Sequence, residues 1–220
     1  MPDIGPRPTF QPVDPAGLPT RLATELVEYP VPGTALRVAI DGPRVADPGA
    51  FAEALVVPLR ALGRPATHIR AEMFWRDAAL RLEYGRTDLT SFVNGWLDVE
   101  ALRREVLDPL GQGGSGRFLS ALRDPVSNRA TREPVRSAEP GSIVLISGEL
   151  LLGQGLPFDR TIHLGVNPVA RRRRTPEQWR WTLPAFDDYD DGVDPVRHAD
   201  VALRYDDPRH PAIRVDPAVP

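Results

Sequence analysis

The fold of this chain follows from one stretch, Ile40-Asp-Gly-Pro-Arg-Val-Ala-Asp-Pro-Gly-Ala-Phe51. Before it stands the apolar run 36–40, which is short, ends at Asp-Gly and is typical of a buried strand in a parallel sheet. After it comes the segment 51–62, where apolar side chains recur at helical spacing until Gly63 stops the pattern. A strand that passes through a short turn into a helix is the opening unit of an α/β fold.

The alternation of strand and helix continues along the chain. Further strands are predicted at 66–70, 142–147, 161–166 and 201–205. Helices are predicted at 20–29 behind Thr20, at 99–107 behind Asp98, and in the arginine-rich segment that follows residue 166. This order predicts an α/β fold with a doubly wound parallel sheet and helices on both faces.

The length of 220 residues favours a single domain with a sizeable core. Six prolines and no periodicity mark residues 1–19 as a Pro-rich leader, extended or disordered. Residues 216–220 are predicted to form a short Pro-rich tail. One α/β domain is therefore predicted over 20–215.

Composition excludes several chemistries. All 27 basic residues are arginine and there is no cysteine, so Schiff-base lysines, thiol nucleophiles, disulfides and cysteine-bound metals are absent. The net charge of −3 gives no case for nucleic acid or an anionic membrane as partner. Neither a membrane-length apolar run nor a signal peptide is recognisable, so we expect a cytoplasmic protein, and homo-oligomer formation stays open.

Three further patterns are interpreted as structural. The sequence 111–116 matches G-x-G-x-x-G but follows a predicted helix instead of a strand, so we interpret it as a surface loop. The acidic run 187–192 lacks the bidentate Glu of a calcium loop and is interpreted as a solvated turn. The four histidines have no metal-binding spacing, so no metal site and no histidine chemistry is predicted.

The turn after the first strand has the position of a phosphate-binding P-loop but not its residues. When G-x-x-x-x-G-K-[ST] is laid on the sequence from Gly42, Asp47 replaces the second glycine, Pro48 the lysine and Gly49 the hydroxyl residue. Pro48 suits the first position of a helix, with Asp47 before it as N-cap. We therefore expect the carboxylate of Asp47 to fill the anion site, leaving Arg44 as the nearest substitute cation.

From Leu22 to Ile213 the chain resembles the uridine kinase family of P-loop nucleoside kinases, in particular its actinobacterial-type members. The resemblance implies a sheet of P-loop kinase type, with ATP and Mg²⁺ as cofactors. It is carried by the order and spacing of 37–42, 73–76, 97–104, 107–111, 140–148, 193–200 and 206–211.

The resemblance also implies roles for individual residues. Glu72 matches the carboxylate base that accepts the nucleoside 5′-hydroxyl proton, and Trp75 an aromatic residue of the nucleoside pocket. The histidine that reads the pyrimidine falls at Asn128 or Arg129. The acidic residue at the end of the strand before Gly148 is Ser147 here, with Glu149 sharing its face only if the strand continues past Gly148. The family's sugar-binding Asp has no counterpart in 91–95. The run Arg171–Arg174 matches the lid helix that clamps phosphates in the family. Arg173 and Arg174 of this run, together with Gly42 and Arg44 of the loop, are therefore predicted to bind nucleotide.

Three functions stay open. The first is a uridine kinase-like protein that has lost ordinary ATP-dependent phosphorylation and acts as a binding or regulatory protein for a nucleoside or nucleotide. The second is an active nucleoside or small-metabolite kinase that uses Arg44 and Arg171 to Arg174 in place of the lysine. The third is a protein-interaction module that works through its Pro-rich ends.

Overall fold

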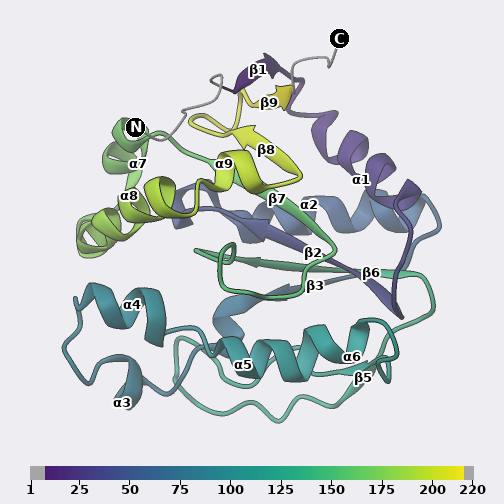
Figure 1. Cartoon of the computed structure of the whole chain (residues 1–220), viewed down its shortest axis with the longest axis horizontal. Coiled ribbons are helices and arrows are strands. Elements are labelled where there is room, and N and C mark those ends of the chain that lie inside the picture. The colour runs from purple at the N-terminus through teal and green to yellow at the C-terminus, as the bar shows by residue number, and fades with distance from the viewer. Residues whose placement is uncertain (1–7, 216–220) are drawn as a thin grey trace.

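The computed structural model describes residues 8–215, and its centre is a seven-stranded sheet in the order β1-β9-β8-β7-β2-β6-β3 (Figure 1). The inner strands run parallel, and β9 and β1 are added antiparallel at the β8 edge. The strands are β1 (Thr9–Pro12), β2 (Ala35–Asp41), β3 (Ala66–Arg70), β6 (Ser142–Gly148), β7 (Arg160–Gly165), β8 (Val201–Arg204) and β9 (Ala212–Val215). A separate short ribbon pairs β4 (Arg117–Phe118) with β5 (Arg136–Ser137).

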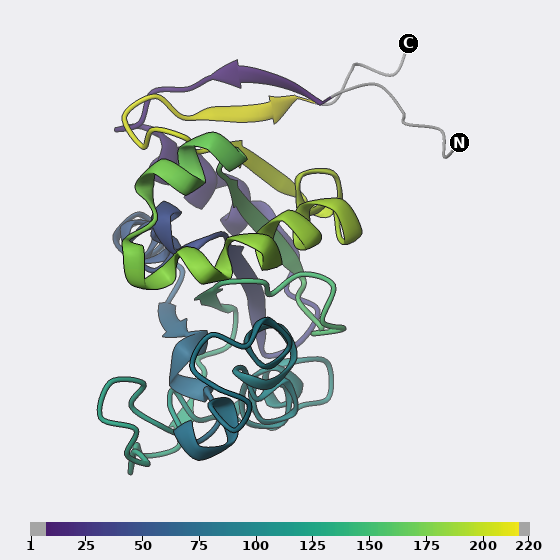
Figure 2. The ribbon, with the colours of Figure 1, turned by 90° about the vertical axis from the view of Figure 1, so that its left-hand side faces the viewer.

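Helices cover both faces of the sheet (Figures 1 and 2). The helices α1 (Leu18–Glu28) and α2 (Pro48–Ala61) pack on one face against Leu36, Val38 and Ile40 of β2. On the other face α5 (Val99–Leu102), a π-helical turn (Arg103–Leu107) and α6 (Asp108–Leu110) pack against Val144 and Ile146 of β6. Residues 35–41 and 142–148 are buried apart from the half-buried Arg37, as expected for strands covered on both sides.

The remaining helices surround the carboxyl ends of the strands. Between β7 and β8 the chain forms α7 (Pro168–Arg174), η4 (Glu177–Thr182), α8 (Leu183–Gly192) and α9 (Pro195–His198), and α9 lies against both strands. After β3 it forms η2 (Ala71–Phe74), α3 (Ala78–Arg81) and α4 (Leu89–Gly95), and α4 contacts η4 and α8. No helix in residues 8–215 is long and apolar enough to cross a membrane.

The predicted fold class is confirmed, and each predicted inner strand is found within one residue of its expected ends. Two sequence interpretations need correction. Residues 9–12 form the edge strand β1 and α1 begins at Leu18, so the domain starts before residue 20. The acidic run 187–192 is helical and belongs to α8, so it is not a turn. The rest of the predicted leader, 1–7, and the predicted tail, 216–220, lie outside the described residues.

Candidate functional site

The loop between β2 and α2 lies at the carboxyl edge of the sheet, where ligands of doubly wound folds bind. Its residues Arg44–Ala46 form the short helix η1, and Asp47 then adopts a left-handed conformation with φ 52°. The Asp47 carboxylate accepts a hydrogen bond from the backbone N–H of Ala50 at 3.0 Å, and Pro48 is the first residue of α2. Asp47 is therefore the N-cap of this helix, and its negative charge lies at the positive end of the helix dipole.

Most backbone N–H groups of this loop already have partners within the protein. The acceptor is Gly148 O for Gly42 (3.2 Å), Glu149 Oε1 for Arg44 (2.8 Å), Pro43 O for Ala46 (2.7 Å) and Arg44 O for Asp47 (3.0 Å). Pro43 and Pro48 have no N–H to offer. A phosphate-binding loop presents these groups to the ligand, whereas here they hold the loop to itself and to the loop after β6.

Arg44 points away from the loop and into the cleft beside it. Its guanidinium forms an ion pair with Glu149 at 2.9 Å and lies 3.9 Å from the ring centroid of Trp179 in η4. β6 ends at Gly148, so Glu149 lies just beyond the strand, and its side chain binds Arg44. Arg44 thus joins the loop after β2, the loop after β6 and η4, which together with α7 (residues 168–182) we call the lid segment.

Glu72 and Glu149 line one small pocket of about 30 Å³ together with Trp75. The Oε2 atom of Glu72 is buried and has no hydrogen-bond partner among the described residues. Burial raises the pKa of Glu149, Arg44 opposes this shift, and the nearby charge of Glu72 adds to it. Two carboxyl groups therefore line the same small pocket, and a raised carboxyl pKa such as that of Glu149 is common at functional sites.

An aromatic cluster closes this pocket. All four tryptophans of the chain belong to it, two from the η2 and α4 side and two from η4. Trp96 lies 5.0 Å from Trp75, 6.1 Å from Trp179 and 5.9 Å from Trp181, measured between ring centroids. The buried Arg81 guanidinium lies 4.9 Å from the rings of both Trp75 and Trp96. Trp96, which lines the pocket, thus also holds η4 through Trp179 and Trp181.

A larger hollow of about 380 Å³ adjoins the closed pocket between α4, the loop 150–154 and α8. The two share Val93, Leu150 and Gln154 as lining residues. Thr90, Asn94, Gln154 and Asp188 supply polar groups in an otherwise apolar wall. A neutral ligand with hydroxyl or amide groups suits such a lining, since amides and hydroxyls both donate and accept hydrogen bonds.

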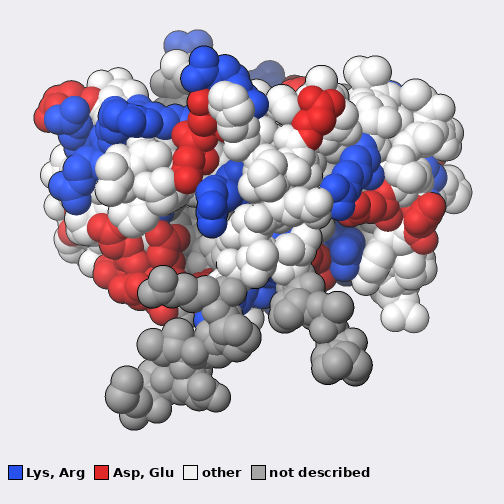
Figure 3. Space-filling view, turned by 90° about the horizontal axis from the view of Figure 1, so that it is seen from above, with Lys and Arg blue, Asp and Glu red and all other residues white. Residues whose placement is uncertain are grey.

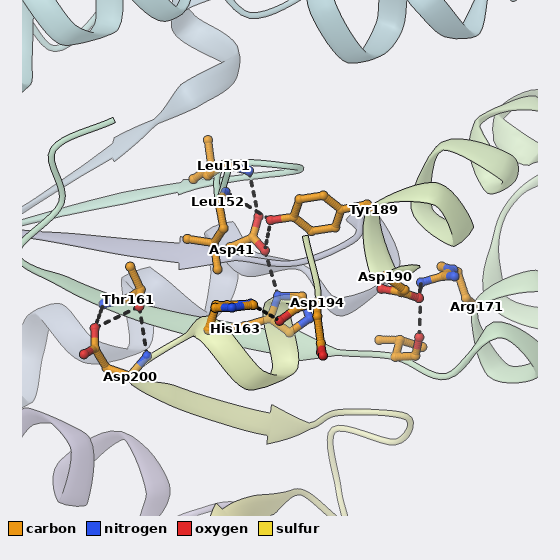
Figure 4. A network of polar contacts seen from close by, with 12 residues as sticks. Asp41, Leu151, Leu152, Thr161, His163, Arg171, Tyr189, Asp190, Asp194 and Asp200 are labelled. Atoms are coloured by element: carbon orange, nitrogen blue, oxygen red, sulfur yellow. Dashed lines mark hydrogen bonds and ion pairs between the residues drawn. The ribbon is translucent and has the colours of Figure 1, made fainter. Parts of the chain in front are cut away.

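A buried polar network lies under the loop (Figure 4). Asp41, the last residue of β2, is fully buried, and its carboxylate accepts from Leu151 N (2.9 Å), Tyr189 Oη (2.9 Å) and His163 Nδ1 (2.7 Å). Tyr189 Oη in turn accepts from Leu152 N at 3.0 Å. Burial beside Asp41 raises the pKa of Tyr189, so its hydroxyl stays protonated and donates. This network fixes β2 to the loop after β6 and to α8.

The structure brings some of the predicted site residues together and separates others. Glu72 and Trp75 share the small pocket, and Arg44 contacts Glu149 at its edge. Arg174 reaches the loop, but it donates to the carbonyl oxygens of Val45, Tyr205 and Asp206. Arg173 is exposed on α7.

Three other positions highlighted by the sequence have their own partners. Asn128 does not line the pocket, and its side chain accepts from the N–H of Ala78, the first residue of α3, at 2.9 Å. Arg171 is buried and bridges Asp187 and Asp190 of α8. Ser147 is bound to His68 at 2.8 Å. Over α7 and α8 basic and acidic side chains lie next to one another on the surface (Figure 3).

Sequence reasoning missed His163 and the contacts of Asp41, and left Glu149 conditional on the course of β6. Asp41 is the last residue of β2, and His163 lies opposite it in the neighbouring parallel strand β7. Their contact can be predicted only when the order of the strands is known. The one usable signal was a charged residue ending an apolar strand, because such a residue is buried only when it is paired.

Comparison with known proteins finds solved structures with a similar fold. No family model and no curated protein sequence matches the chain. Among solved structures it is similar to a possible uridine kinase from Bacillus stearothermophilus, with a TM-score of 0.67 and 18% identity over 84% of this chain and 96% of that one. The chain has the fold of the P-loop kinases. A protein assigned as a fructose transport system kinase from Silicibacter sp. TM1040 is also similar, with a TM-score of 0.55 and 21% identity over 86% and 90% of the two chains.

No group of three His, Asp or Glu side chains in residues 8–215 is arranged to hold a metal ion. The likeness extends over most of the chain and establishes the architecture, whereas activity has to be argued from the residues of the cleft.

Proposed function

We propose that this protein is a kinase-fold binding or regulatory protein that takes a nucleoside-like ligand and has lost ordinary ATP-dependent phosphoryl transfer. The observation that carries the proposal is the state of the P-loop, whose N–H groups are bound to protein oxygens and whose helix N-terminus is capped by Asp47.

Mg·ATP does not fit this loop. Position 48 supplies proline where the lysine would contact the phosphates, and position 49 supplies glycine where a hydroxyl would bind Mg²⁺. Loss of a single preorganised donor costs roughly 10²- to 10³-fold in rate in well-studied enzymes. Two such losses, together with a carboxylate at the helix N-terminus, argue against phosphate binding of the usual kind.

The acceptor side of the cleft supports retained binding. Glu72 keeps a carboxylate in the closed pocket, Trp75 supplies an aromatic surface, and the adjoining hollow provides room with amide and hydroxyl groups. A ligand with an aromatic ring and hydroxyl groups, such as a nucleoside, matches these features. Regulation would follow if ligand binding shifts the lid, because Trp179 in the lid contacts Arg44 of the loop.

The decisive experiment measures Mg·ATP and uridine binding by calorimetry and uridine phosphorylation by a coupled assay. We expect no micromolar binding of Mg·ATP and no turnover. Micromolar Mg·ATP affinity with uridine turnover near ~1 s⁻¹, in the usual range of kinases, would refute the proposal. The matched control is the triple variant Asp47→Gly, Pro48→Lys and Gly49→Thr, which restores the P-loop residues and removes the Asp47 cap. Any Mg·ATP binding that it gains over the parent measures how far these three residues, rather than the Glu149 and Arg174 contacts, close the loop.

An active kinase that uses arginines is the second candidate, favoured by Arg44 and Arg174 contacting the loop region. It requires Arg44 to leave Glu149 and turn toward the ligand. In that case Arg44→Ala would abolish a measurable phosphorylation and Glu72→Gln would remove the base. An Arg44→Ala variant with unchanged product formation excludes this candidate.

A further inference from the structure

A separate cavity of about 400 Å³ lies between the sheet and α9. Residues of β7 and β8 line one side of it, and the end of α8, α9 and Phe10 of β1 line the others. Val166, Val196 and Leu203 contribute apolar wall. None of its lining residues lines the Glu72 pocket or the space under Trp179, so it is distinct from the cleft of the proposed function.

His163 presents a hydrogen-bonding atom to this cavity. The side chain is 3% exposed, and its Nδ1 atom is bound to the Asp41 carboxylate. Because a carboxylate only accepts, Nδ1 carries the proton, and in the neutral ring Nε2 is an acceptor. No hydrogen bond among residues 8–215 involves Nε2, although the ring lines the cavity. This ring nitrogen therefore has no protein partner among these residues, and it can accept a hydrogen bond from a ligand in the cavity.

Carboxylates surround the same cavity. Asp190 and Asp194 line it, and Figure 4 shows both in the neighbourhood of His163. Asp190 accepts from Arg171 through Oδ2 at 2.9 Å, and Asp194 forms an ion pair with Arg197 through Oδ2 at 3.2 Å. Oδ1 of Asp190 has no hydrogen bond among the described residues and is available to a ligand. Burial raises the pKa of Asp190 even with Arg171 beside it, so a further cation would stabilise this carboxylate.

We propose that this cavity binds a primary ammonium compound with an apolar body. An ammonium group has three N–H donors and no acceptor, which matches the acceptors of His163, Asp190 and Asp194. The apolar wall matches a hydrocarbon or aromatic body, and the volume lies within the range of small-molecule sites. Anions are disfavoured because three carboxylates, Asp190, Asp194 and Asp206, line the cavity with one arginine, Arg204. The two arginines beside it, Arg171 and Arg197, are bound to Asp190 and Asp194.

The test uses three probes of nearly equal shape, benzylamine, benzyl alcohol and benzoate, titrated into the full chain and followed by ¹H–¹⁵N NMR. Benzylamine is expected to shift the amide signals of Gly165, Val166 and Val196 and to bind at least tenfold more tightly than the alcohol. Benzoate is expected to leave these signals unchanged.

Charge-removing variants then test the site. Asp190→Asn and Asp194→Asn should each weaken benzylamine binding by about tenfold, the size expected for losing a charged hydrogen-bond partner. Asn tolerates the left-handed backbone of Asp194 (φ 46°), so this variant retains the fold even if Asp190→Asn does not. The control Asp191→Asn removes the same charge from an exposed position of α8 outside the cavity and should bind like the parent.

Several results would overturn the proposal. Equal affinity for the amine and the alcohol would remove the role of the charge, and tighter binding of benzoate would reverse it. Unchanged affinity in the folded Asp194→Asn variant, shifts confined to the tryptophan indole signals of the cleft, or no binding of benzylamine at millimolar concentration would each do the same.

Discussion

Replacing Arg44 with alanine should loosen the lid and make stability depend on pH in a defined direction. The side chain makes a charged hydrogen bond to Glu149, and such bonds contribute about 1.5–3 kcal/mol. Its contact with Trp179 adds about 0.5–1 kcal/mol, the range for an exposed cation–π pair. Since the Arg44 side chain is 38% exposed, solvent screening reduces the total, and we expect a loss of about 1–3 kcal/mol at neutral pH.

The pH dependence follows from Glu149. Burial raises its pKa in the folded chain, and Arg44 holds that rise down. A carboxyl group with a higher pKa in the folded than in the unfolded state binds its proton more tightly when folded, so the folded state loses stability as pH rises through that pKa. Without Arg44 the rise in the pKa of Glu149 is unopposed, and the loss of folded-state stability with rising pH becomes larger. The difference between the parent and Arg44→Ala should therefore be small near ~pH 4 and greatest toward ~pH 8.

Urea unfolding followed by far-ultraviolet circular dichroism across this pH range measures the free energy of unfolding, and tryptophan emission reports the lid. The control is Arg180→Ala, which removes an exposed ion pair with Glu177 from the same segment and should cost less than about 0.5 kcal/mol. Equal losses in the two variants, or an Arg44→Ala loss that stays constant with pH, would refute the reasoning.

Three further predictions concern single residues. Asp41→Asn should destabilise by about 3–5 kcal/mol in urea unfolding and Tyr189→Phe by less, because Asp41 is fully buried and accepts three hydrogen bonds; a loss below about 1 kcal/mol for Asp41→Asn would contradict this. Asp47→Ala should lower the melting temperature by the equivalent of about 1–2 kcal/mol while Asp47→Asn changes it little, since only Asn keeps the cap and tolerates φ 52°; equal effects would argue against the cap. Glu72→Met should raise stability by about 1 kcal/mol in the same assay, because Oε2 is buried without a partner; clear destabilisation would show that Glu72 is satisfied.

The parallel core was predictable because its signal is local. The segments 36–40 and 142–147 are short and mostly apolar, and burial on both faces requires such runs. The edge strand β1 was not predictable, since its residues Thr9–Pro12 alternate only weakly, include a proline and gain their partner from β9 near the other end of the chain. Edge strands have little sequence signature of their own.

The candidate site was predictable only where a side chain contacts the backbone of its near neighbours in the sequence. The Asp47 cap follows from Asp before Pro at a helix start, and the structure has it. The partners of Arg44 and Asp41 could not be derived, because they come from segments more than 100 residues away, and ion pairs of this kind depend on how loops meet after folding. Asp187 and Asp190 were assigned to a solvated turn because the sequence does not show how α7, which carries their partner Arg171, packs on α8.

The loop conformation does not result from the missing lysine alone. Glu149 binds both the backbone N–H and the guanidinium of Arg44, and this holds the loop from the side of β6. Arg174 binds the carbonyl of Val45 from the side of the lid, and Asp47 caps α2 from within the loop. Each of these contacts would persist if residue 48 were changed by itself, because none involves its side chain. The closed loop is therefore a property of three surrounding elements, and an open phosphate cradle would require all of them to release it.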